Sequence, residues 1–108
     1  VFSWRGPMAK PADNCATILK VLADDTRLAV VRQLMAGPQQ VNEINTTLQL
    51  EQSLLSHHLR VLRDAGIVSS QRDGKAVCYR LSDDVMAGMK SGDSINLGCC
   101  CLSFGSRP

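Results

Sequence analysis

The sequence has few aromatic side chains: one Trp, one Tyr and two Phe among 108 residues. A hydrophobic core therefore has to consist mainly of aliphatic and methionine side chains. No apolar run is long enough to cross a membrane, and no stretch resembles a secretory signal. We therefore expect a cytoplasmic protein with no membrane partner, in a compartment that keeps thiols reduced.

Internal repeats and low-complexity segments are also lacking. The composition, 44% hydrophobic and 20% charged, is that of a globular chain. We expect one folded domain over residues 11–95, an arm or non-native remnant at 1–10, and a cysteine-containing tail at 96–108. A core of this size is modest, and chains of this length often gain stability by forming oligomers.

Basic residues gather between positions 60 and 80, although the net charge of the chain is only +2. This segment contains Arg60, Arg63, Arg72, Lys75 and Arg80 but only two acidic residues, Asp64 and Asp73. A locally basic surface fits nucleic acid. The alternative is an ordinary solvated face, so a structural motif has to decide between the two.

Hydrophobic spacing predicts a mainly α-helical fold with one small β-hairpin. We expect two helices within residues 13–38, separated where Asp24 or Asp25 can cap the second. A short helix over 41–50 and a longer one over 53–66 follow. Asp73-Gly74 then predicts a hairpin turn between two strands within 67–81. A weaker helix, capped by Ser82, is expected over 82–94.

A short helix, a break and a longer helix form a helix-turn-helix, and the hairpin after it makes a winged helix. On a helical wheel the fourth helix is apolar on one side, where His58 reads as a core residue, and polar on the other. The polar side suits DNA bases in the major groove. The predicted DNA-binding residues are Gln52, Ser53, Ser56, His57 and Arg60, with Arg72 and Lys75 from the hairpin.

Two stretches, "VLADDTRLAVVRQLMAG" and "LLSHHLRVLRDAGIVSSQRDGKAVCYRL", resemble the ArsR family of bacterial metal-sensing repressors. The resemblance covers roughly residues 15–85. It implies a homodimeric winged helix-turn-helix with its first and last helices at the dimer interface. It also implies a repressor that binds double-stranded operator DNA and is released by a ligand.

Two ligand patterns of that family are missing. Arsenic sensors of one type carry Cys-Val-Cys at the start of the third helix, where this chain has Gln40-Val41-Asn42. Zinc sensors carry Asp and His on the last helix, and no histidine follows Leu81 here. An effector site, if present, therefore has to use other residues.

The five cysteines are the remaining candidates for that site. Thiolates select soft ions, and the resemblance suggests As(III) or Sb(III), which binds three sulfurs. The predicted ligands come from Cys15, Cys99, Cys100 and Cys101, whereas Cys78 reads as a structural residue. Three consecutive cysteines in regular structure cannot all face one ion. The alternatives are a soft divalent metal such as Cd(II), and a redox or persulfide response in which Cys15 pairs with a tail cysteine.

An enzyme is not predicted. Nucleophilic catalysis needs a base beside the cysteine and a third group to orient it. Both histidines, His57 and His58, belong to the helix expected to contact DNA, and no glycine-rich phosphate loop is present. No catalytic residue or catalytic cofactor is therefore expected.

Overall fold

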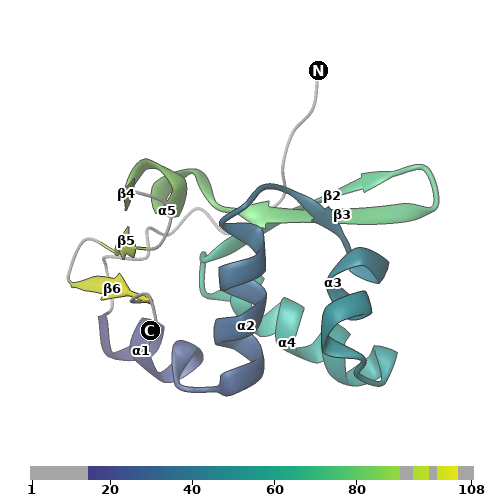
Figure 1. Ribbon diagram of the computed structural model, residues 1–108, viewed down its shortest axis with the longest axis horizontal. Coiled ribbons are helices and arrows are strands. Elements are labelled where there is room, and N and C mark those ends of the chain that lie inside the picture. Colours follow the sequence, from purple (N-terminus) through teal and green to yellow (C-terminus); the bar gives the residue numbers. More distant parts are fainter. Residues whose placement is uncertain (1–14, 91–93, 98–99, 105–108) are drawn as a thin grey trace.

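The computed structural model describes residues 15–90, 94–97 and 100–104. In this part of the chain no helix is long and apolar enough to span a membrane. The helices are α1 (Cys15–Leu22), α2 (Asp25–Leu34), α3 (Val41–Leu48), α4 (Gln52–Asp64) and α5 (Asp83–Ala87). The strands are β1 (Gln39–Gln40), β2 (Val68–Asp73), β3 (Ala76–Leu81), β4 (Met89–Lys90), β5 (Ser94–Asn96) and β6 (Cys101–Ser103). The winged helix-turn-helix predicted from the sequence is present (Figure 1).

Polar side chains cap the N-terminal ends of α2 and α3. Asp24 is the N-cap of α2, and its carboxylate accepts a hydrogen bond from the Arg27 backbone N–H at 3.1 Å. A capping box starts α3, in which the Glu43 side chain accepts from the Gln40 backbone N–H at 2.7 Å. The cap expected at Asp13 or Asn14 for the first helix lies outside the described residues.

The turn between α3 and α4 is held by one asparagine. The Asn45 amide donates to the Leu50 carbonyl at 2.8 Å and accepts from the Leu50 N–H at 2.7 Å. Gln49, between them, has a left-handed backbone with φ of 54°. A residue with a left-handed backbone at this point reverses the chain sharply. The Asn45 side chain then fixes the direction in which α4 starts.

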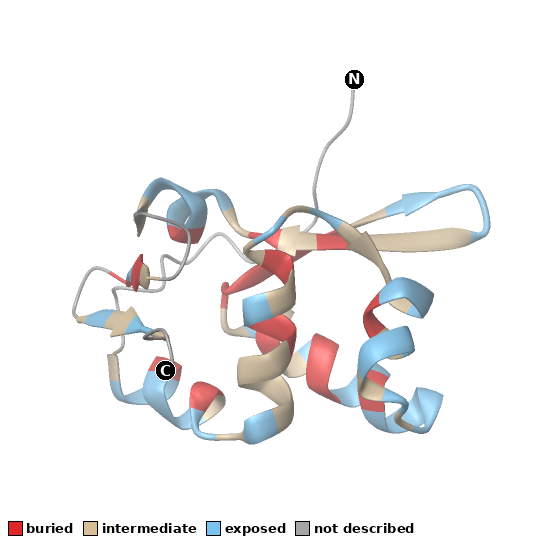
Figure 2. Ribbon diagram, in the orientation of Figure 1, coloured by how far each residue is buried: buried red, intermediate tan, exposed pale blue. Residues whose placement is uncertain are grey.

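The α4 helix begins at Gln52, with Glu51 as its N-cap, and Ser53 lies in its first turn. The helix ends as predicted before Gly66, which has a φ of 82°. Its buried side consists of Leu55, His58, Leu59 and Leu62. The three leucines belong to a core with Val30, Val31, Leu34, Ile44, Ile67, Val68 and Leu81, and Figure 2 shows buried segments in red.

The wing is an antiparallel hairpin of β2 and β3. Asp73 pairs with Ala76, so the turn residues are Gly74 and Lys75, one position later than the Asp73-Gly74 turn expected from the sequence. Gly74 has a φ of 64°, which favours glycine. The sequence analysis missed β1, which pairs with β3 through Gln39–Tyr79 and Gln40–Cys78.

The predicted last helix is wrong beyond Ala87. The α5 helix has five residues, capped by Ser82, and a three-stranded antiparallel sheet in the order β4–β5–β6 follows it. Two features favour the sheet: Gly88 is a poor residue inside a helix, and the buried Ile95 and Leu97 alternate with the exposed Asn96. The Asn96 N–H donates to the Gly88 carbonyl at 2.8 Å, at a place where a Cβ on residue 88 would overlap the Asn96 carbonyl.

We expect Asn45→Ala to lower the free energy of unfolding by about 1–2 kcal/mol, because both Leu50 backbone groups lose their side-chain partner. Urea denaturation measures this loss. Thr46→Ala is the matched control, since the exposed Thr46 hydroxyl donates only to the Asn42 carbonyl of its own helix. Equal stability of the two variants would show that Asn45 does not fix the turn.

Candidate DNA interface and thiol cluster

The outer side of α4 carries the polar residues expected at DNA. Gln52, Ser53, Ser56, His57 and Arg60 are all exposed, opposite the buried leucines. The side chains near the start of the helix are small or uncharged, so the helix can approach a base edge closely. The wing adds Arg72 and Lys75, which are also exposed and lie near its tip. The fold thus presents all seven residues at the surface.

Not every basic residue of the 60–80 segment belongs to this surface. Arg80 forms an ion pair with Asp83, with its Nη2 atom 2.9 Å from the carboxylate Oδ1. Its side chain is only 20% exposed, and that of Asp83 is 85% exposed. Arg80 therefore ties β3 to the start of α5, and its charge is partly neutralised there.

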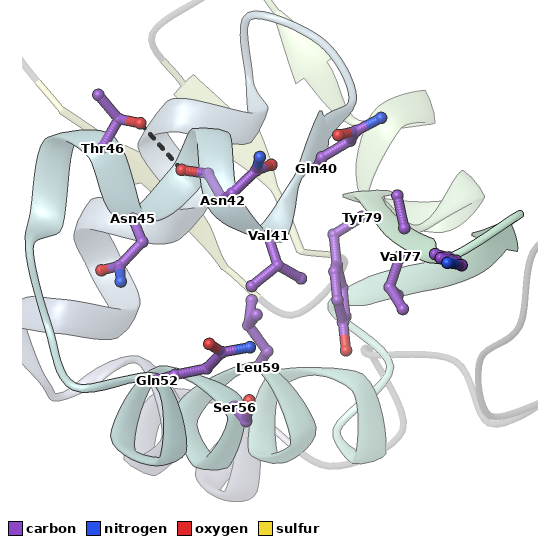
Figure 3. A pocket seen from close by; sticks show the side chains of 12 residues that line it. Gln40, Val41, Asn42, Asn45, Thr46, Gln52, Ser56, Leu59, Val77 and Tyr79 are labelled. Carbon is purple, nitrogen blue, oxygen red and sulfur yellow. Dashed lines mark hydrogen bonds between the residues drawn. The ribbon is translucent and has the colours of Figure 1, made fainter.

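A pocket of about 650 Å³ opens between α3, α4 and β3. Figure 3 shows Gln52 and Ser56 of α4 below it, Asn42 and Thr46 of α3 beside it, and the Tyr79 ring standing between helix and strand. Lys75 also lines it. The sequence analysis missed the α3 residues and Tyr79. The spacing of Asn42 and Thr46 on one side of α3 was the available signal.

The histidine predicted to be a core residue is buried, with 8% of its surface exposed. His58 is nevertheless not surrounded by apolar groups alone. The Arg27 side chain of α2 donates a hydrogen bond from Nε to His58 Nδ1 at 3.0 Å. Because a guanidinium has donors and no acceptor, His58 Nδ1 is the acceptor of this bond.

The first helix and the tail bring two cysteine sulfurs together. The Cys15 Sγ and Cys100 Sγ atoms lie 3.9 Å apart, although 85 residues separate them. The Leu97 N–H donates a hydrogen bond to the Cys100 carbonyl at 2.8 Å. Figure 1 shows β6 lying beside α1, at the end of the molecule away from the wing.

The cysteines differ in bonding state and exposure. Cys15 is disulfide-bonded, whereas Cys78 and Cys101 are free thiols. Cys100 is half-buried, and Cys101, the next residue, is exposed. The structure thus brings together Cys15 and Cys100 of the predicted ligands, and it leaves Cys101 at the surface. Cys99 lies outside the described residues.

The separation of the two sulfurs suits a shared soft ion. Tetrahedral zinc with Zn–S bonds of about 2.3 Å places its sulfurs about 3.8 Å apart. Within residues 15–90, 94–97 and 100–104 no group of three or more His, Cys, Asp or Glu side chains could hold a metal ion. With Cys15 reduced, the described residues would therefore provide a pair of ligand sulfurs and not a complete site.

Cys78 lies in β3, away from this pair. Burial raises the pKa of the Cys78 thiol, and the negative charges of Glu43 and Asp73 add to the effect. A raised pKa keeps the group as a neutral thiol at neutral pH, and the thiol is a weaker ligand and nucleophile than the thiolate. This agrees with a structural role for Cys78.

The architecture defines a class: a helix-turn-helix followed by a two-stranded wing is a winged-helix DNA-binding domain. Comparison with known proteins identifies the family. The sequence profile described as "Bacterial regulatory protein, arsR family" matches residues 24–70. The chain is 31% identical over 95 residues to the "Arsenical resistance operon repressor" of Staphylococcus aureus, covering 84% of this chain and 91% of that protein. The chain belongs to the ArsR family.

Two further relatives show the extent of the likeness. The "HTH-type transcriptional repressor SmtB" of Mycobacterium tuberculosis is 37% identical over 81 residues, which are 75% of this chain and 60% of that repressor. The chain thus spans less than two thirds of the length of SmtB. The solution structure of the homodimeric winged helix-turn-helix domain Mb0332 from Mycobacterium bovis has a TM-score of 0.63 and 29% identity. The aligned region covers 69% of this chain and 69% of the Mb0332 chain. These relatives are named as regulators or DNA-binding domains, in agreement with the prediction that the chain is not an enzyme.

We expect Cys78 to react with iodoacetamide more slowly than Cys101 at pH 7.5, because Cys78 is half-buried and its pKa is raised. The Cys78 rate should keep rising as the pH approaches and passes the ordinary thiol value. Peptide mass spectrometry of the folded, reduced protein follows both sites, and the urea-unfolded chain is the control. Equal rates in the folded protein would contradict the assignment.

Proposed function

We propose that this protein is a transcriptional repressor that leaves its operator when a trivalent metalloid, As(III) or Sb(III), binds its cysteine thiolates. The observation that carries the proposal is the approach of Cys15 to Cys100, 3.9 Å apart, in a winged-helix chain of the ArsR family. Since the operator is bacterial DNA, we place the protein in the cytoplasm.

Double-stranded DNA is the proposed partner of α4 and the wing. Gln52 can bond an adenine edge, and Arg60 can bond guanine or a phosphate. Ser53, Ser56 and His57 complete the exposed side of α4, and Arg72 and Lys75 reach the backbone or the neighbouring groove. The pocket between α3 and β3 adds Asn42 and Thr46 as candidate phosphate contacts.

We propose a homodimer, because a single recognition helix reads only half of a palindromic operator. The similar Mb0332 domain is described as homodimeric. Large apolar side chains are exposed on the first and last helices, with Leu19 of α1 at 49% and Met86 of α5 at 42%. Contact with a second copy would bury them. The short α5 leaves β4–β6 beside it as a further part of that surface.

The proposed metalloid ligands are Cys15, Cys99 and Cys100. Cys15 and Cys100 are already adjacent, and Cys99 is assigned from the sequence alone. Trivalent arsenic and antimony take three sulfur ligands, whereas zinc and cadmium prefer four. Cys101 is exposed on β6 and is a weaker candidate ligand than Cys100, which lies beside Cys15. The relative from Staphylococcus aureus is named for arsenical resistance, which supports this choice of ion.

A redox response is the second candidate, because Cys15 is disulfide-bonded in the structure. Two thiols would lose two protons and two electrons to hydrogen peroxide, forming one S–S bond and two water molecules. The same cysteine cannot then bind a metalloid until the disulfide is reduced. Oxidation and metalloid binding thus compete for Cys15.

We expect Arg60→Ala and His57→Ala to weaken specific operator binding by about 1–3 kcal/mol if each contacts a base. Lys75→Ala should weaken binding to all DNA sequences similarly and reduce the salt dependence. Fluorescence anisotropy with operator and scrambled DNA separates the two effects. Lys20→Ala is the control, because it removes one exposed positive charge from α1. Operator binding like wild type in both α4 variants would refute the proposed reading surface.

We expect Cys15→Ser and Cys100→Ser to bind the operator like the reduced wild type but to remain bound when arsenite is added. Each variant lacks one of the two sulfurs that the fold places together. The measurement is an operator-release titration with As(III), Sb(III), Cd(II), Zn(II) and peroxide.

Cys78→Ser is the matched control for that titration and should respond like wild type, because Cys78 lies in the wing strand β3. Release of wild type by peroxide alone would favour the redox function. Loss of the arsenite response in Cys78→Ser, with a normal response in the other two variants, would place the site elsewhere.

A further inference from the structure

The Cys15–Cys100 sulfur pair lies at one end of the molecule, the wing lies at the other end, and α4 lies between them beside α2 (Figure 1). Figure 1 shows α1 and β6 at one end of the longest axis, the wing at the other, and α2 between them. An effector can release DNA only if the two ends have coupled conformations. The described residues that join α1 to α4 are therefore of direct interest.

The Arg27 side chain forms hydrogen bonds to both α1 and α4. Arg27 lies in the first turn of α2. Its Nη1 atom donates to the Val21 carbonyl near the end of α1 at 3.3 Å, and its Nε atom donates to His58 Nδ1 of α4 at 3.0 Å. The same residue's backbone N–H donates to the Asp24 carboxylate, which holds the pKa of that carboxyl below its ordinary value. A single guanidinium thus bridges three helices.

The acceptor in α4 is next to the DNA-facing surface. The His57 and His58 rings have centroids 5.6 Å apart, with His57 exposed and His58 buried. A shift of the His58 ring would therefore displace the neighbouring His57, which is a proposed DNA contact. At the other end, Val21 belongs to the eight-residue helix that begins with Cys15. Cys15 and Val21 lie six residues apart on this helix, about 9 Å along its axis.

We propose that Arg27 transmits the effector state of α1 to the recognition helix α4, as a positioning residue that touches neither the effector nor DNA. This inference rests on the proposed function. When the thiolates of α1 and the tail close on an ion, α1 shifts and its Val21 carbonyl moves relative to Arg27. The guanidinium then keeps either the Val21 bond or the His58 bond in good geometry, so α4 has two discrete positions.

Arginine is required because of its shape. The planar guanidinium presents Nε and Nη1 in fixed directions, toward two acceptors at once. A lysine ammonium keeps the charge but has a single nitrogen, so it cannot replace both bonds in the same geometry. Arg27→Lys therefore preserves the charge while removing the bridge.

The test uses the whole 108-residue chain in its reduced state, with sodium arsenite and operator DNA. Three quantities are measured for each variant: arsenite binding from the sulfur–arsenic ultraviolet absorbance, operator affinity by anisotropy, and the thermal unfolding midpoint. Wild type should lose about 5- to 150-fold in operator affinity when arsenite is bound. Arg27→Lys should bind arsenite normally but lose no more than about twofold, because the effector state no longer reaches α4.

The partner residue provides a rescue. Asn places a side-chain oxygen near the position of histidine Nδ1, so His58→Asn should keep the arsenite response, whereas His58→Leu should lose it. Arg32→Lys is the matched control on the same helix. Arg32 lies over the Phe104 ring, 5.3 Å from its centroid, and a lysine retains a cation there. This variant should respond like wild type.

The outcomes separate the two proposals. Wild type that binds no arsenite, or binds it and keeps its operator, would refute the proposed function. A normal arsenite response in Arg27→Lys would overturn the relay alone. Loss of arsenite binding in Arg27→Lys would also overturn it, because Arg27 would then shape the thiol site. If His58→Leu fails to fold, the contrast between Arg27→Lys and Arg32→Lys still decides.

Discussion

The burial of one side of α4 is the constraint on which the rest of this structure depends. Leu55, Leu59 and Leu62 are each at most 1% exposed, and they fix the rotation of the helix about its own axis. That rotation leaves Ser53, His57 and Arg60 facing outward. The Asn45 amide fixes where the helix begins, since it bonds both backbone groups of Leu50. A DNA-facing surface is therefore the consequence of packing on the opposite side of α4.

A buried polar contact has been kept inside this apolar packing. His58 occupies a core position of α4, yet it accepts a hydrogen bond from Arg27 where a leucine would satisfy the hydrophobic pattern. A buried polar pair adds little net stability, because its desolvation offsets much of the bond. The Arg27–His58 hydrogen bond is directional, so it forms in one arrangement of α2 and α4 and is lost in another. Such a contact suits a protein whose recognition helix has to respond to a distant site.

The errors of the sequence interpretation have local physical reasons. The residues after Ala87 were expected to continue a helix, but Gly88 is needed where the Asn96 backbone comes close, and Ile95 and Leu97 alternate toward the core. The hairpin turn was expected at Asp73-Gly74 and occurs at Gly74-Lys75, because pairing of Asp73 with Ala76 extends the ladder by one pair. This shift puts Lys75 itself in the turn. The division into a domain up to residue 95 and a tail from 96 stays a prediction, although β5 runs across that boundary.

The sequence by itself determined the winged helix, because hydrophobic periodicity, a helix cap at Asp24 and a glycine-containing turn are local properties of the chain. It also determined which residues of α4 face outward, since a helical wheel needs only the sequence. Only the tertiary structure decided that Cys15 meets Cys100 across 85 residues, and that Cys101, the next residue, is exposed. It alone revealed the partner of His58 and the contribution of Asn42 and Thr46 to the pocket. These contacts depend on how separate elements pack, and periodicity within one element contains no information about that packing.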